Sequence, residues 1–333
     1  MGALFLFTHK ANPDSTIGFK YKKHDNPLLL VLKELFNNRL LYIMALPGIV
    51  LFFIFSYLPM VGITIAFKNF RFDKGFLGSA WADPIYKNFL YFFTSEYAWR
   101  VTRNTLALNA MFILIGTIVT VALALMVNEI GNKYFKKITQ NFMFLPHFVS
   151  WIIVGVFAYN LFSYDYGVIN SFMVSNGLEK VDWYSNPYYW PFILLAFNIW
   201  KGAGFGTVIY LAVLSGIDLS YYEAAKADGA TRLQQIWYIS IPMLMPTVLT
   251  LTILAVGRIM NADFGMFYAL IGENSQLFKT TDVIDTFVFR SLRRSGDIPM
   301  SSAAGFYQSC VSFILILLVN KLAGRYNKEA ALF

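Results

Sequence analysis

The stretch SYYEAAKADGATRLQQIWYISIP, residues 220–242, has mixed polarity and lies between two long apolar runs. Its residues predict two short helices joined by a tight turn. Ser220 and Glu223 are three residues apart, which is the spacing of a capping box at a helix start. Gly229 follows as a residue that can adopt the left-handed conformation in which many helices end. The segment is therefore either a structured docking surface or an ordinary amphipathic connector.

The second half of the stretch supports the more structured interpretation. Thr231 and Gln234 repeat the capping-box spacing and predict the start of a second helix. Pro242 and Pro246 suit the opening of the next apolar helix, because the first-turn N–H groups of a helix have no partner within it.

Composition places most of the chain in lipid. The 333 residues are 57% hydrophobic, 14% charged and 18% aromatic, and the apolar residues are grouped in long runs. Soluble proteins carry about 25% charged residues. The formal charge of +8 is distributed along the segments between the runs, so membrane orientation explains it better than nucleic acid does. The single cysteine, Cys310, excludes an internal disulfide.

Six apolar segments are long enough to cross a hydrocarbon core of about 30 Å. The predicted spans cover approximately residues 41–67, 104–127, 145–163, 191–217, 243–260 and 302–322. The fold class is thus an all-α integral membrane protein. An even number of spans puts both termini on one side, and Lys and Arg favour that side only slightly.

The polar, basic residues 1–40 form a predicted tail, in which 27–39 has the apolar spacing of an interfacial helix. The apolar run at residues 4–7 is too short for a signal peptide, so the first span is expected to serve as the insertion signal.

The sequence lacks recognisable motifs for nucleotide binding, metal binding and catalysis. No phosphate-binding Gly-x-x-x-x-Gly-Lys-Ser/Thr pattern occurs, the three histidines are scattered, and no catalytic constellation is recognisable. The chain is therefore expected to be no enzyme and to hold no cofactor, and its energy source is expected on another polypeptide.

Polar residues inside the spans are the candidates for a translocation path, since such groups are costly in lipid and usually face the interior of a bundle. The candidates are Asn198, Lys201, Arg258, Asn261 and Asp263. Arg258 is also compatible with snorkelling to the interface, and a structural role for Lys201 is as plausible as a role in the path.

The pattern Glu-Ala-Ala, three residues, Gly, nine residues, Ile-x-Leu-Pro resembles the signature loop of permease subunits in bacterial ABC importers. Glu223, Ala224, Ala225, Gly229, Ile239 and Pro242 match it, whereas Ile241 stands where Leu is usual. Further stretches resemble permeases for complex saccharides, such as those for alginate oligosaccharides and the lipoprotein-like polysaccharide permeases: 214–218, 232–237, 282–286 and 329–333.

The resemblance implies a type I importer permease in the bacterial inner membrane, with a six-helix domain at 41–323, a cytoplasmic coupling loop at 217–242, and cytoplasmic tails at 1–40 and 324–333. It implies that Glu223, Ala224, Ala225, Asp228, Gly229, Ile239 and Pro242 contact the ATPase subunit. The implied partners are a second homologous permease, two ATPase subunits that bind ATP and Mg, an extracellular solute-binding protein and a saccharide. A secondary transporter, a membrane enzyme and a purely structural subunit are less consistent with the loop.

Overall fold

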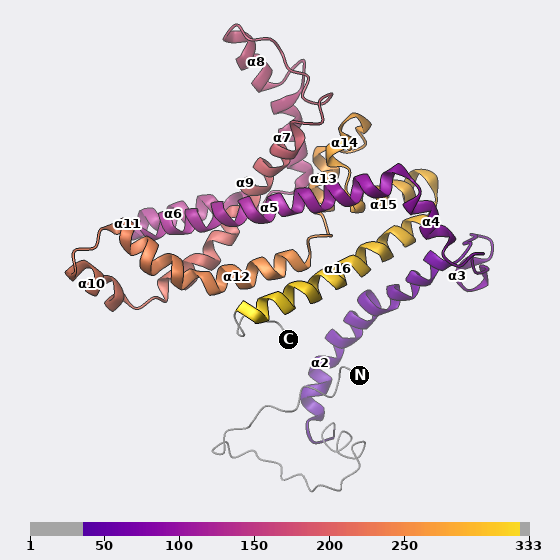
Figure 1. The fold of residues 1–333 in the computed structure, drawn as a ribbon, viewed down its shortest axis with the longest axis horizontal. Coiled ribbons are helices and arrows are strands. Elements are labelled where there is room, and N and C mark those ends of the chain that lie inside the picture. Colours follow the sequence, from indigo (N-terminus) through magenta and orange to yellow (C-terminus); the bar gives the residue numbers. More distant parts are fainter. Residues whose placement is uncertain (1–35, 327–333) are drawn as a thin grey trace. The chain divides into compact units, whose positions relative to one another are not determined.

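The computed structural model describes residues 36–326, and its regular elements there are helices apart from one isolated antiparallel bridge between Lys68 and Trp81. The chain divides into two compact units, residues 1–61 and 62–333 (Figure 1). Most of the tail at 1–40, most of the expected interfacial helix at 27–39 and the end of the chain from 327 onward lie outside the described residues.

From Arg39 on, the described residues of the first unit belong to one apolar helical run, Arg39–Phe67, which continues into the second unit. It comprises α2 (Arg39–Phe52), a π-helical turn (Phe53–Tyr57) and a 3-10 segment (Leu58–Phe67). The run is long enough to cross a membrane and agrees with the first predicted span.

Four further membrane-length helices lie in the second unit (Figure 1). They are α5 (Glu96–Asn128), α9 (Trp190–Ser215), the continuous helix Arg232–Gly257 that ends in α12 (Ile241–Gly257), and α16 (Ile298–Tyr326). α5 packs along α9, and α12 packs against α16. These helices agree with the second, fourth, fifth and sixth predicted spans, although their boundaries differ.

The third predicted span, 145–163, is wrong as a straight helix. The chain instead forms α6 (Lys133–Phe144) with a 3-10 turn (Leu145–Phe148), and then bends by 95° into α7 (Trp151–Phe162). Pro146 lacks an N–H group, and the Ser150 side chain caps the new helix by accepting from the N–H of Ile153 at 3.4 Å. At 1.5 Å per residue the 12 residues of α7 extend only about 18 Å. The described chain thus has five membrane-length helices, or six if the bent pair counts as one span.

The fifth span begins earlier than the sequence indicated. α11 (Arg232–Gln235), a π turn (Ile236–Ser240) and α12 form one helix, so Pro242 does not open it. The N–H of Ile241 reaches back five residues to the carbonyl of Ile236. This wider turn accommodates Pro242, which has no N–H to donate to the preceding turn.

Glycine allows close backbone contact where the broken span meets its neighbours. A Cβ atom on Gly204 of α9 would lie 1.8 Å from the carbonyl oxygen of Met143 in α6. A Cβ atom on Gly155 of α7 would lie 2.5 Å from the carbonyl oxygen of Ala269 in α13 (Phe264–Leu270). Both positions therefore require glycine for the packing that is observed.

Short helices occupy the two ends of the second unit (Figure 1). α10 (Leu219–Ala227) lies with α11 at one end, and α4 (Lys87–Phe93) and α15 (Ile284–Arg290) lie at the other. The remaining short elements are α3 (Gly75–Gly78), α8 (Val168–Ser175), α14 (Phe278–Thr281), the 3-10 turn Ser275–Leu277 and the π turn Ser291–Ser295.

Candidate functional site: a capped elbow and an intramembrane cavity

The segment that joins α9 to the fifth span is a helical elbow formed by α10, Gly229 and α11. α10 begins earlier than the capping box predicted, because Asp218 is its N-cap and accepts from the N–H of Ser220 at 2.9 Å. This hydrogen bond holds the pKa of Asp218 below its usual range. The predicted Ser220–Glu223 box is therefore wrong. The carboxylate of Glu223 is exposed and has no hydrogen bond or ion pair with any described residue.

The turn of the elbow confirms the expectation for Gly229, which has φ of +82°. The N–H of Ala230 donates to the carbonyl of Ala225 at 2.9 Å, and the N–H of Gly229 donates to that of Lys226 at 3.1 Å. These two bonds form a Schellman motif, which satisfies the last carbonyls of α10.

The second arm of the elbow is fixed as the sequence predicted. Thr231 caps α11 by accepting from the N–H of Gln234, whose side chain accepts in return from the N–H of Thr231 at 2.7 Å. The hydroxyl groups of Tyr222 and Ser240 lie 2.9 Å apart and connect α10 to the π turn. The elbow is thus held by three capping motifs and by the contact between Tyr222 and Ser240.

Five of the seven sequence-predicted contact residues lie in this elbow, and Ile239 and Pro242 lie in the helix that continues from it. Glu223, Ala224, Asp228 and Gly229 are exposed, and Ala225 is partly buried. Ile239, in the π turn, is partly buried, and Pro242, in the first turn of α12, is exposed. Large apolar side chains also face outward here: Leu219 is 71% exposed and Leu233 70% exposed. The elbow therefore presents apolar and acidic groups on a rigid frame.

A second site lies among α5, α9, α12 and α13. Four of the five path candidates line one cavity of about 290 Å³: Asn198, Arg258, Asn261 and Asp263. An adjoining cavity of about 260 Å³ shares Asn198 and continues between α5, α9 and α12. The structure thus brings together polar residues from two predicted spans.

Lys201, the fifth candidate, does not line this cavity. Its amine donates to the carbonyls of His147 at 2.7 Å and Val149 at 2.6 Å, and it lies 5.3 Å from the ring centroid of Trp151. Those carbonyls belong to the 95° break between α6 and α7. Lys201 therefore ties α9 to the break.

The polar groups of the cavity differ in their availability. Asp263 caps α13 by accepting from the N–H of Met266 at 3.1 Å, and it also accepts from the indole N–H of Trp151 at 2.7 Å. Arg258 is exposed, and its guanidinium group has no hydrogen bond or ion pair with any described residue. Its guanidinium group is thus the cation available to a ligand in this cavity.

Asn109 is a cavity residue that the sequence reasoning missed. It lies on α5 and donates to the carbonyl of Ile259 at 2.7 Å. The signal was an amide within the apolar run of the second span, which is the same signal that identified Asn198.

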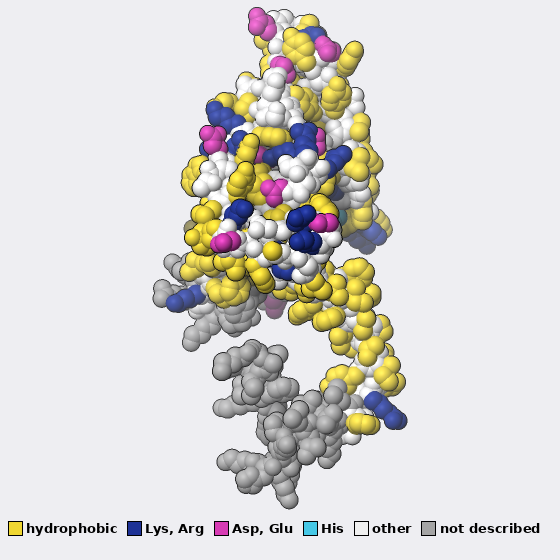
Figure 2. Space-filling model, turned by 90° about the vertical axis from the view of Figure 1, so that its right-hand side faces the viewer, with side chains coloured by type: hydrophobic (Ala, Val, Ile, Leu, Met, Phe, Trp, Pro, Cys, Tyr) yellow, Lys and Arg dark blue, Asp and Glu magenta, His cyan; other side chains and the backbone are white. Residues whose placement is uncertain are grey.

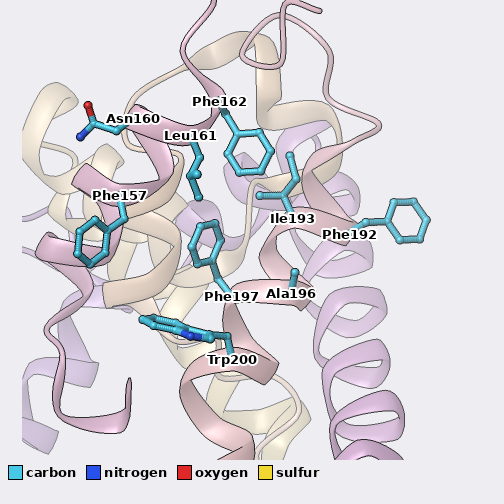
Figure 3. A pocket seen from close by; sticks show the side chains of 9 residues that line it. All are labelled: Phe157, Asn160, Leu161, Phe162, Phe192, Ile193, Ala196, Phe197 and Trp200. Atoms are coloured by element: carbon cyan, nitrogen blue, oxygen red, sulfur yellow. The ribbon is translucent and has the colours of Figure 1, made fainter. Parts of the chain in front are cut away.

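An apolar pocket of about 650 Å³ between α7 and α9 is a weaker candidate for a polar ligand (Figure 3). Phe197, Trp200 and Leu161 are directed toward it in Figure 3, and Asn160 is the one polar residue in its lining. Hydroxyl-rich ligands need convergent hydrogen-bonding groups, which this lining does not supply.

The long apolar helices, the polar intramembrane cavity and the capped elbow define a helical membrane transport subunit. The family model described as "Binding-protein-dependent transport system inner membrane component" matches residues 112–328, and the chain belongs to this family.

Two relatives from Bacillus subtilis (strain 168) match most of the chain. The polygalacturonan/rhamnogalacturonan transport system permease protein YteP is 35% identical over 309 residues, covering 93% of this chain and 94% of the relative. Protein LplB is 35% identical over 314 residues, covering 92% and 98%.

Solved structures show the same fold. The chain is similar to one in the crystal structure of a bacterial ABC transporter involved in the import of the acidic polysaccharide alginate, with a TM-score of 0.80, 33% identity, and coverage of 90% of this chain and 99% of that chain. A chain in the alginate transporter complex with an alginate pentasaccharide-bound periplasmic protein gives a TM-score of 0.79 at 34% identity, with coverage of 89% and 98%. The all-α membrane fold and the type I importer permease class expected from the sequence are confirmed.

Proposed function

We propose that this chain imports a complex saccharide as one of two permease subunits, which together form the path across the bacterial inner membrane. An extracellular binding protein delivers the saccharide, and two separate ATPase subunits bind ATP and Mg. The names of the relatives, which are transport systems for polygalacturonan, rhamnogalacturonan and alginate, support a saccharide substrate.

The observation that carries this proposal is the rigid elbow with Glu223 unpaired on its surface. Both arms are capped, the turn is fixed by Gly229, and Tyr222 is bonded to Ser240 across the elbow. An element held in this way transmits a displacement to α9 and the fifth span, whereas a flexible loop would absorb it. Because Glu223 has no partner among the described residues, its carboxylate is available to a basic group on the ATPase.

The same assignment places the elbow, both termini and the tails in the cytoplasm. The intramembrane cavity then lies on the path of the saccharide. Asn198, Asn261 and Asn109 carry amides of the kind that bind sugar hydroxyls, and Arg258 supplies an unpaired cation.

The test is charge reversal at Glu223 in the transporter reconstituted in proteoliposomes. We expect Glu223→Lys to leave the amount of permease in the membrane unchanged, while it uncouples saccharide uptake from ATP hydrolysis. Glu179→Lys, which makes the same charge change on the exposed segment after α8, serves as the control and retains wild-type uptake. Wild-type uptake and substrate-stimulated ATPase activity in Glu223→Lys would refute the coupling role.

A further inference from the structure

A second polar cavity lies at the end of the second unit opposite α10 and α11. Its volume is about 490 Å³, and its lining comes from α4, α5, the 3-10 turn Ser275–Leu277, α14, α15, the π turn Ser291–Ser295 and α16. Three arginines and two tyrosines face it, and no carboxylate is among its lining residues. Figure 2 views the molecule from this end and shows basic side chains among apolar and acidic ones.

Two of the arginines are held in place by one buried carboxylate. Asp282 is 1% exposed and accepts from Arg100 at 3.0 Å and from Arg290 at 2.9 Å. Each guanidinium group contacts Asp282 through Nη2 alone, and Nε of Arg100 is buried without a partner. Since a guanidinium group carries five N–H donors, this cluster keeps a net positive charge and unused donors.

The third arginine has a similar arrangement. Arg294 pairs with Glu273, which also lies 3.7 Å from Arg293. One carboxylate is again shared by two guanidinium groups. The four arginines are therefore opposed by two ion-paired acids, and the cavity retains an excess of positive charge.

Aromatic rings fix the orientation of the cations. The guanidinium carbon of Arg290 lies 4.1 Å from the ring centroid of Phe278, and that of Arg100 lies 5.0 Å from the ring centroid of Tyr97. Tyr91 is 68% exposed and adds a second phenol ring to the lining. Planar cations beside aromatic faces suit a ligand that has both a carboxylate and an apolar ring face.

We infer that this cavity binds a carboxylate-bearing sugar residue, so that the saccharide proposed above is an acidic one. This inference rests on the proposed function, which places this end of the bundle on the side where the saccharide arrives. Bidentate pairing with arginine is the usual mode of carboxylate recognition. The cavity volume of about 490 Å³ lies within the range of about 300–1,000 Å³ that is typical of small-ligand sites. This volume favours a sugar residue over an acidic side chain of a docked protein, which would need only a surface contact.

The experiment measures binding of tetragalacturonate to the complete transporter in nanodiscs, without the binding protein, by isothermal titration calorimetry. Its fully methyl-esterified form is the matched neutral probe. We expect Arg294→Gln to weaken tetragalacturonate binding by about three- to tenfold, a modest effect because the side chain is 55% exposed. Arg293→Gln is the control, since Arg293 also pairs with Glu273 but does not line the cavity.

The outcomes separate this inference from the proposed function. Equal affinity for the acidic and esterified probes, or equal effects of the two substitutions, would overturn the acidic-sugar site even if ATP-dependent uptake of saccharides is normal. Weaker association with the binding protein in Arg294→Gln, with unchanged tetragalacturonate affinity, would assign the cavity to protein docking and also overturn it. Absence of any saccharide uptake by the wild-type transporter would instead contradict the proposed function.

Discussion

Replacing Gly229 with alanine tests the elbow through its backbone alone. Gly229 has φ of +82°, and an added Cβ atom would have no atom within 4 Å, so no side-chain clash contributes. A residue with a Cβ atom in the left-handed region costs roughly 1–2 kcal/mol. Gly229→Ala therefore disfavours the turn by a factor of about 5–30.

Gly177→Ala is the matched control. Gly177 has φ of +76°, and a Cβ atom added there would also have no atom within 4 Å. Its N–H and that of Leu178 form the same pair of bonds, to the carbonyls of Val174 at 3.0 Å and Met173 at 2.9 Å. The two substitutions thus impose the same local strain at different places.

The assay is the affinity of the purified ATPase subunit for the permease pair in nanodiscs, measured together with saccharide uptake. We expect Gly229→Ala to weaken ATPase binding by up to about 30-fold, because only the fraction of elbows in the correct conformation can dock and that fraction falls at most by the factor that disfavours the turn. Gly177→Ala should bind the ATPase with wild-type affinity. Equal affinities for the two variants would refute the reasoning that the turn orients a docking surface.

Three further predictions concern the broken span, helix packing and pH. Lys201→Met leaves two carbonyls at the break without their cation and should lower stability by about 1–2 kcal/mol in thermal unfolding. Arg258→Met removes a cation that has no partner among the described residues, so it should leave stability unchanged and reduce uptake. Equal melting temperatures for the two variants would contradict the role of Lys201 in joining α9 to the break. Gly204→Ala should destabilise the folded chain by about 1–3 kcal/mol, because its Cβ atom would lie 1.8 Å from a carbonyl oxygen. Gly202→Ala, whose Cβ atom would have no atom within 4 Å, should be neutral or stabilising. The opposite order of stabilities would argue against the close packing of α9 on α6. Burial raises the pKa of Asp285 despite its hydrogen bonds, so the folded chain keeps this proton to higher pH than the unfolded chain, and stability falls as pH rises between the two pKa values. Asp285→Asn should therefore be more stable than wild type at neutral pH and should lose this advantage near about pH 4. A stability advantage that grew on acidification would contradict this sign.

The parts of the elbow that follow local rules could be predicted from the sequence. The left-handed turn at Gly229 and the box at Thr231 depend on residues within a few positions of each other. The start of α10 was predicted wrongly because Asp218 and Ser220 are both good cap residues, and the capping-box spacing favoured the wrong one. Choosing between caps two residues apart depends on where the preceding helix ends.

Features that join distant segments could not be predicted in this way. Lys201 was recognised as unusual, yet its role depends on a break in another span 52 to 54 residues away. Arg100 pairs with Asp282, which is 182 residues further along the chain. Pro146 and Ser150 did signal the break locally, and they were overlooked because the apolar run around them is long enough for a straight span.

The most direct test of the account is chemical cross-linking from the elbow in the reconstituted transporter. Ala224→Cys in a Cys310→Ser background, labelled with a short reagent that carries a maleimide and a photoreactive diazirine and then irradiated, should yield a product that contains this chain and the ATPase subunit. Ser175→Cys, on exposed α8, should yield none. A cross-link from Ser175→Cys and none from Ala224→Cys would contradict the claim that the elbow docks on the ATPase.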